Sequence, residues 1–249
     1  MRLFILLLLA VLGFELSATA ARSEPPAIAS EQAVDPEALE LARIMTPLED
    51  YMAREIRMAR QAFLAVSATD PDAKALETDY PGLYAYTWKA LEPELRRYTS
   101  QSHPALLRRL AQIYQRHLNP AERQALRTFY LTPTGRRVLH TMYYETDATP
   151  MVDELVANPE AKISAGSLAA VQRNGEAKVM AGFGPADEEA GRALMRGVPA
   201  AKFQTVSEAV AALTLELANQ ADPVWDAKAE KLTLKAMKRF MKQQRSKDR

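Results

Sequence analysis

Apolar residues recur at every third or fourth position through most of this chain. Three successive stripes with that spacing are Leu106, Leu107, Leu110, Ile113, Tyr114 and Leu118; Ala125, Leu126, Phe129 and Tyr130; and Val138, Leu139, Met142 and Tyr143. This is the period of a helix with one buried face. Strands would need sustained alternation, and no segment shows it convincingly. The pattern therefore predicts an all-α protein, either a multi-helix array or two packed helical bundles.

The prolines predict where these helices begin. Eight of the fifteen follow Asp, Asn or Thr. Such a side chain can accept the N–H groups of a first helical turn, and proline at the next position has its φ already set and no N–H to satisfy. At Asp70 a simple turn is an equal alternative. The pairs are Asp35-Pro36, Thr46-Pro47, Asp70-Pro71, Asn119-Pro120, Thr132-Pro133, Thr149-Pro150, Asn158-Pro159 and Asp222-Pro223.

The first residues have the pattern of an export signal. Arg2 precedes an apolar run over residues 3–12, and small residues follow at Ala18 and Ala20. Ten apolar residues are too few for a membrane-spanning helix, which needs about 20. We expect residues 1–20 to be a signal peptide that is removed. An uncleaved helix that tethers the chain to a membrane is the alternative.

The composition indicates that side-chain packing, without disulfides, must stabilise the fold. The chain of 249 residues has no cysteine, so neither a disulfide nor a lipid on a cysteine is available. Small exported domains often depend on disulfides, whereas a chain of this length can bury a real core.

The predicted organisation has four parts after the signal peptide. Residues 21–34 lack periodicity and are typical of a flexible leader. A helical domain over 35–146 and connecting helices with a loop over 147–183 follow, and a second helical unit covers 184–249. Within the connection, Asn174-Gly175 is interpreted as the C-cap of a helix rather than as a hairpin turn.

One segment, residues 114–139, carries a motif that resembles a known family. Its members are Asn119, Pro120, Glu122, Phe129, Tyr130, Thr132, Pro133, Gly135 and Arg136. The segment resembles the domain of unknown function 2059, whose members are exported helical proteins of Gram-negative bacteria. Thr132 stands where that family usually has Ser. The resemblance implies export and a helical fold, and it implies no established activity.

In physical terms the motif is two helices and a corner. Asn119 would cap the first helix, the pair Phe129-Tyr130 would close its buried face, and Thr132 would cap the second helix. Gly135 would allow the first helix to approach closely. The motif therefore specifies packing rather than chemistry.

A degenerate second copy of this unit is a further hypothesis. Residues 185–187 match residues 120–122 at a shift of 65, and apolar positions continue to correspond over 184–219. Chance similarity between two alanine-rich amphipathic helices is the alternative.

Candidate chemistry is sparse. The sequence has no recognised nucleophile, phosphate-loop or zinc motif. His117 and His140 could meet and bind a metal with Glu145, but a half-buried structural role for His117 is favoured, and His103 lies apart from both. Acidic residues 187–189 are interpreted as complementing a helix dipole. We therefore assign no catalytic residue, no cofactor and no metal ligand.

An aromatic cluster around Pro81-Gly82 has two interpretations. Its members are Asp79, Tyr80, Tyr84, Tyr86 and Trp88. They could line a groove for a glycan or a peptide, or they could form the packing edge where a loop enters a helix, which is favoured.

The C-terminal segment has the clearest charge asymmetry. Residues 226–249 hold nine basic and three acidic side chains, a net charge of +6, which leaves −5 for residues 1–225 because the whole chain is +1. An apolar stripe runs through the segment, so it is predicted to be a basic amphipathic helix. The stripe is Ala229, Leu232, Ala236, Met237, Phe240 and Met241. The candidate interaction face is Lys235, Lys238, Arg239, Lys242 and Arg245.

Three roles for this helix stay open. It could pack on the domain with its cations in solvent, lie on an anionic membrane surface, or dock on an acidic protein.

These features predict a periplasmic protein with a non-enzymatic binding or assembly role in the cell envelope. Secretion or peripheral membrane association are alternatives in location, and an envelope hydrolase of an unrecognised kind is the alternative in function. The expected partner is an envelope protein or an anionic lipid surface. No nucleic-acid partner is expected, because the protein is predicted to be exported and residues 1–225 carry a net negative charge.

Overall fold

The computed structural model describes residues 33–158 and 162–247, and within them every regular element is a helix, which confirms the all-α prediction. The predicted signal peptide, most of the leader and Pro159 lie outside the described residues. The elements are α2 (Pro36–Met45), α3 (Leu48–Thr69), α4 (Pro71–Asp79), α5 (Leu83–His117), α6 (Pro120–Leu131), α7 (Pro133–His140), the π-helix η1 (Thr141–Glu145), α8 (Thr149–Ala157), α9 (Ala165–Ala181), α10 (Pro185–Gly197), α11 (Ala200–Ala218) and α12 (Pro223–Lys247).

Most of the predicted helix starts are confirmed. The side chains of Asp35, Asp70, Asn119, Thr132 and Asp222 each accept a backbone N–H from the first turn of the helix that their proline begins. The two other described pairs are displaced by one residue. Helix α3 begins after Pro47, and α8 already includes Thr149.

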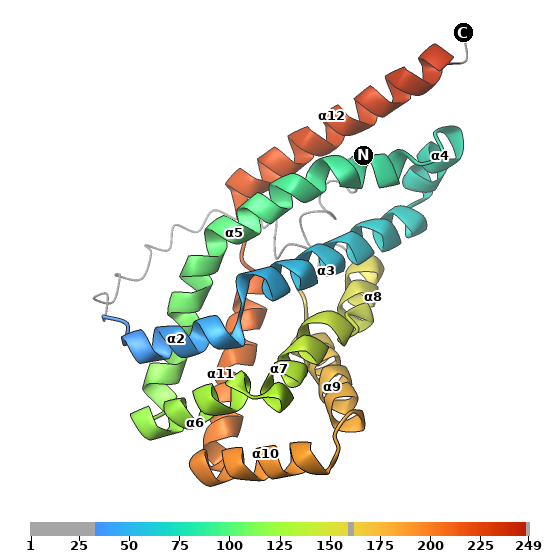
Figure 1. Cartoon of the computed structure of the whole chain (residues 1–249). Helices are drawn as coiled ribbons and strands as arrows, with labels where there is room; N and C mark the ends of the chain where they lie inside the picture. The colour runs from blue at the N-terminus through green and yellow to red at the C-terminus, as the bar shows by residue number, and fades with distance from the viewer. Residues whose placement is uncertain (1–32, 159–161, 248–249) are drawn as a thin grey trace.

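Helix α5 is the longest element, and its continuity was not predicted. It runs for 35 residues and contains Pro93 and Pro104 in its interior. Each proline removes one backbone hydrogen bond and crowds the preceding turn, and α5 bends along its course (Figure 1). Its start is defined by Gly82, with φ +87°, whose N–H donates to the carboxylate of Glu77 at 2.7 Å.

The N-terminal half of α5 builds the first hydrophobic cluster. Here α3 and α4 pack on one side and α12 packs alongside (Figure 1). The buried members are Ile56, Ala59, Phe63, Ala73, Leu83, Tyr84, Trp88, Leu91, Leu95, Trp225, Ala229 and Met237. The last helix of the chain is therefore part of the core rather than an appendage.

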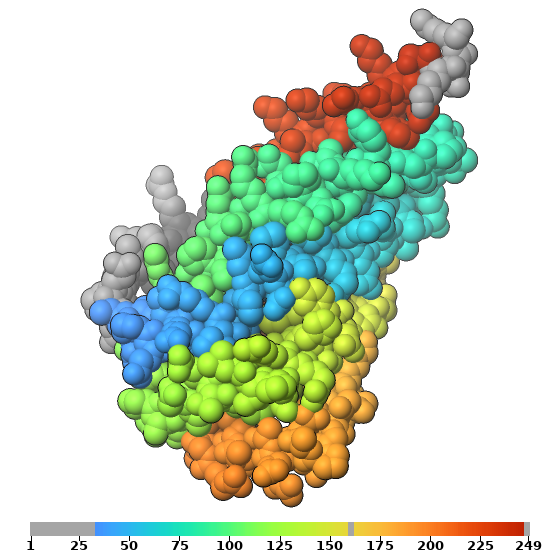
Figure 2. Space-filling model, in the orientation of Figure 1, coloured from blue at the N-terminus to red at the C-terminus, as the bar shows by residue number. Residues whose placement is uncertain are grey.

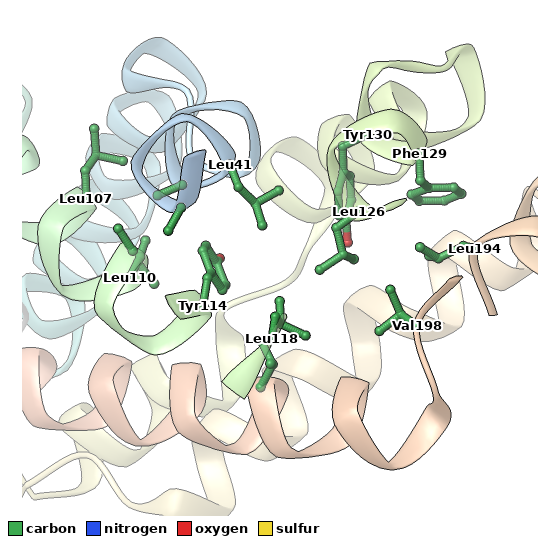
Figure 3. Packing of buried hydrophobic residues seen from close by; sticks show 14 of the residues in the cluster. Leu41, Leu107, Leu110, Tyr114, Leu118, Leu126, Phe129, Tyr130, Leu194 and Val198 are labelled. Atoms are coloured by element: carbon green, nitrogen blue, oxygen red, sulfur yellow. The ribbon is translucent and has the colours of Figure 1, made fainter. Parts of the chain in front are cut away.

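The C-terminal half of α5 builds a second cluster with α2, α6, α10 and α11. Tyr114 lies near its centre, between Leu41 of α2 and Leu118 (Figure 3). Leu194 and Val198 approach the same core from the far side of α6 (Figure 3). A third, smaller cluster joins α8 and α9 through Met151, Leu155, Ile163, Leu168 and Val171.

The predicted C-cap at Asn174-Gly175 is wrong, because α9 continues to Ala181. Gly175 is buried against η1 and the residue that follows it. A Cβ at this position would lie 2.7 Å from Thr146 Oγ1 and 3.0 Å from Met142 Sδ. The glycine therefore permits close packing inside a helix instead of ending one.

Helices α10 and α11 begin the predicted second unit, and they complete the second cluster. The N–H of Gly184 donates to Asp187 Oδ2 at 2.9 Å, as the N–H of Asn119 donates to Glu122 Oε2 at 2.8 Å. The two helix starts thus share a hydrogen bond, and the duplication itself stays a prediction.

Two glycines of α10 give a matched test of the packing between α10 and α6. A Cβ at Gly197 would lie 2.6 Å from the Cβ of Ala125 in α6, whereas a Cβ at Gly191 would meet nothing within 4 Å. We expect Gly197→Ala to lower the free energy of unfolding by about 2 kcal/mol. Gly191→Ala should raise it by up to about 1 kcal/mol, because alanine favours the helix. Urea unfolding followed by circular dichroism measures both.

The double variant Gly197→Ala with Ala125→Gly exchanges the two side chains across the contact. It should recover part of the lost free energy of unfolding. A loss of about 1 kcal/mol should remain, because glycine is unfavourable inside α6. Equal effects of Gly197→Ala and Gly191→Ala would show that α10 does not approach α6 in this way.

Candidate interaction surface

The motif at residues 119–136 forms the corner between α6 and α7. Asn119 and Glu122 satisfy each other's backbone N–H groups, at 2.9 and 2.8 Å. Thr132 Oγ1 accepts the N–H of Gly135 at 3.1 Å and donates to the carbonyl of Phe129 at 2.6 Å. The corner is thus closed by hydrogen bonds at both of its helix starts.

Gly135 lies where the two helices touch. A Cβ there would come within 2.2 Å of the carbonyl oxygen of Phe129 and 2.5 Å of Tyr130 Cα, so no side chain fits without moving the backbone. Phe129 and Tyr130 are buried, with their rings edge to face at 5.1 Å. Arg136 is exposed on the outer side of α7.

Residues 104–148 match the domain of unknown function 2059, described as an uncharacterized protein conserved in bacteria. This confirms the resemblance over part of the chain, from the C-terminal half of α5 through α6, α7 and η1. A search of curated proteins finds no match, and a search of solved structures finds none.

Two buried charges fix this family segment to the rest of the fold, and the sequence analysis did not single them out in that role. Arg123 is 6% exposed; it donates to the carbonyl of Leu118 at 2.8 Å and pairs with Asp35, the cap of α2. Asp187 of α10 accepts from Thr134 at 2.6 Å and pairs with Arg137. The pKa of the Asp187 carboxyl lies below its ordinary value. The main cause is the hydrogen bond from the N–H of Gly184, and the next is the hydrogen bond from Thr134.

Two arginine side chains of α3 contact the π-helix η1. Arg57 donates to the carbonyl of Tyr143 at 2.8 Å, and Arg54 lies over the rings of Tyr51 and Tyr143 at 5.5 and 5.3 Å. The hydroxyl of Tyr143 donates to the carbonyl of Met45 at 2.9 Å. The bond from Arg57 thus gives one backbone carbonyl of η1 a side-chain donor.

The three histidines lie in different surroundings. His103 is buried and bonds to the carbonyl of Thr46 at 2.9 Å, and His117 is half-buried at the end of α5. His140 is exposed, stacks on Tyr144 at 4.7 Å and has Nδ1 3.8 Å from Glu145 Oε1. Across residues 33–158 and 162–247, no three His, Asp or Glu side chains are placed to hold a metal ion.

The aromatic cluster at the start of α5 is the packing edge of α12. Tyr84 and Trp88 are buried in the first cluster, and the ring of Tyr86 lies 5.1 Å from that of Phe240. The Tyr80 hydroxyl accepts from Arg245 Nε at 3.1 Å. Through Tyr80 and Tyr86 the cluster therefore supports α12.

Helix α12 places its predicted apolar stripe on α5. Ala229, Ala236 and Met237 are buried, and Leu232, Phe240 and Met241 pack partly buried beside them. Near its start, Tyr98 of α5 stacks on Trp225 at 4.7 Å and donates to Asp222 at 2.9 Å. Lys228 pairs with Glu94 at 2.7 Å.

The opposite side of α12 is the candidate interaction surface, called the basic face below. It consists of Lys235, Lys238, Arg239, Lys242 and Arg245, all of them exposed. Lys238, Lys242 and Arg245 border an open hollow of about 420 Å³. Helix α12 forms the upper ridge of the molecule in Figure 2, away from the family segment at α6 and α7.

The basic face has no acidic counterpart in the structure as far as it is described: none of its five side chains forms an ion pair there. Some cations elsewhere are paired, as Arg96 is with Glu92, Arg109 with Glu216 and Arg127 with Glu40. None of the described helices has the length and apolar character that crossing a membrane requires.

The first turn of α12 holds a carboxyl with an unusual pKa. Burial, reinforced by the charge of Asp222, raises the pKa of Asp226 to about 6 from the ordinary 3.8. Its Oδ1 atom is buried without a hydrogen-bond partner among the described residues. The folded protein therefore binds this proton more tightly than the unfolded chain does.

Asp226 is expected to make the stability of the protein depend on pH. Its contribution is full below pH 3.8 and is lost as pH rises through about 6. At neutral pH, Asp226→Asn should therefore raise the free energy of unfolding by about 1 kcal/mol, allowing for solvent at this partly exposed group. The gain should vanish in acid. Thermal unfolding across the pH range measures it.

Glu230→Gln is the matched control, because Glu230 is an exposed acid one turn further along α12. It should not reproduce the pH-dependent difference. An Asp226→Asn gain that stays constant with pH would contradict the assignment.

Proposed function

We propose that this chain is an exported, non-enzymatic protein with a binding or assembly role in the cell envelope, and that the basic face of α12 is its binding surface. The observation that carries the proposal is the contrast within α12. One side is fixed in the first hydrophobic cluster, while the other displays five cations without acidic partners among the described residues.

Export is supported by the N-terminal pattern and by the resemblance of the family segment. Arg2, the apolar residues 3–12 and the small residues before position 21 have the order of a signal peptide. Residues 104–148 match a bacterial family. Because the chain contains no cysteine, an oxidising compartment would not alter the covalent structure.

A binding role is supported by where the polar side chains of the family segment are used. Asn119, Glu122 and Thr132 complete helix starts, and Arg123 and Arg137 form ion pairs with other helices. These groups stabilise the fold. The cations of the basic face have no acidic partner among the described residues, although Arg245 donates a hydrogen bond to Tyr80.

Cell fractionation tests the proposal with a matched pair of variants. The full chain is produced in a Gram-negative host, and its N-terminus is determined by mass spectrometry. The wild type should begin at Ala21 and sediment with the envelope. Neutralising the face by Lys235→Gln, Lys238→Gln and Lys242→Gln should leave export intact and shift most of the protein into the soluble periplasmic fraction.

The control removes the same amount of charge elsewhere through Arg108→Gln, Arg173→Gln and Arg192→Gln, all exposed positions outside α12. It should fractionate as the wild type does. Retention of the precursor in the cytosol would contradict export, and equal behaviour of the two triple variants would contradict the role of the basic face.

A further inference from the structure

The basic face is a straight row of charge. Lys231, one turn earlier and also exposed, extends it, so that cations follow one another at intervals of three or four residues from 231 to 245. At 1.5 Å per residue the row is about 21 Å long. The acids of α12, Asp226 and Glu230, stand more than a quarter turn from the centre of this row.

The helix cannot turn its apolar side outward without dismantling the core. Ala229 is 0% exposed and Ala236 and Met237 are each 5% exposed, because all three pack in or beside the first cluster. Any partner of the outer side therefore meets lysine and arginine head groups rather than an apolar stripe. Its attraction to α12 must be mainly electrostatic.

The shape of the surface indicates which class of anion it fits. Protein interfaces concentrate their energy in buried aromatic and arginine side chains seated in pockets. The basic face instead follows the exposed side of α12, the helix at the top of Figure 2, and the hollow beside it is open rather than a closed pocket. Four of its six cations, counting Lys231, are lysines, which act as flexible point charges toward phosphate. Such a row can meet many phosphates in one plane without fixed positions.

We propose that the outer side of α12 binds the anionic phosphate headgroups of a lipid membrane, with the helix lying along the surface. This rests on the proposed function and names its partner. Binding is peripheral: the first cluster stays closed, and only the cation row touches the bilayer. It follows that salt should reverse the attachment, since the screening length falls from about 10 Å at 0.1 M to about 3 Å at 1 M.

Sedimentation with vesicles tests the proposal. The probes are phosphatidylcholine vesicles and vesicles that contain equal parts of phosphatidylcholine and phosphatidylglycerol. The protein is the chain purified after export, so every variant carries the same N-terminus. The wild type should sediment only with the anionic vesicles at low salt and should be released at high salt.

The variants separate charge from other causes. A lysine near an anionic surface changes the partition coefficient roughly fivefold, so Lys235→Gln, Lys238→Gln and Lys242→Gln together should lower it roughly 100-fold. The charge-retaining set Lys235→Arg, Lys238→Arg and Lys242→Arg should bind as the wild type does. The control set Arg108→Gln, Arg173→Gln and Arg192→Gln should lose less than fivefold. Circular dichroism verifies that each variant is folded.

The outcomes distinguish this inference from the function on which it rests. If the wild type sediments with the cell envelope through the basic face but ignores anionic vesicles, the lipid partner is refuted and an acidic envelope protein is implied, while the proposed function stands. If neither envelope nor vesicles respond to the lysine variants, both fail. Equal binding to neutral and anionic vesicles would also overturn the lipid inference, because charge would not be its cause.

Discussion

Burial of apolar side chains against α5 is the interaction on which the rest of this structure depends. With no cysteine in the chain, nothing covalent joins its distant parts. The N-terminal half of α5 forms the first cluster with α3, α4 and α12, and the C-terminal half forms the second with α2, α6, α10 and α11. Helices that are far apart in the sequence, from α2 to α12, are thus held by one element, which contains two internal prolines and bends along its course (Figure 1).

Local rules predicted much of this architecture. The capping side chains of Asp35, Asn119 and Thr132 act over only a few residues, so their pattern is visible in the sequence. The same reasoning failed where packing outweighs propensity. Pro93 would be expected to end a helix, yet Leu91 and Leu95 on either side of it are buried, and α5 continues. Gly175 likewise lies inside α9, at a point where Met142 of η1 and Thr146 leave no room for a side chain.

The candidate surface was predictable in part. Spacing alone placed the cations of α12 on one face and its apolar residues on the other, because both follow the helical period. The spacing could not predict which helix covers the apolar side of α12. The contact of Trp225 with Tyr98 joins residues more than a hundred positions apart, as does that of Lys228 with Glu94. The pairs of Arg123 with Asp35 and of Arg137 with Asp187 join residues 88 and 50 positions apart.

The family segment has a consequence for its relatives that follows from its surroundings. Residues 104–148 bury Leu126 and Phe129 against partners that lie outside the match, among them Leu41 of α2 and Leu194 of α10 (Figure 3). Arg123 and Arg137 also pair with carboxylates outside the match, Asp35 at the start of α2 and Asp187 of α10. The matched stretch is therefore an incomplete folding unit. A bacterial protein that shares it must supply its own covering helices, or a second subunit, however different their sequences have become.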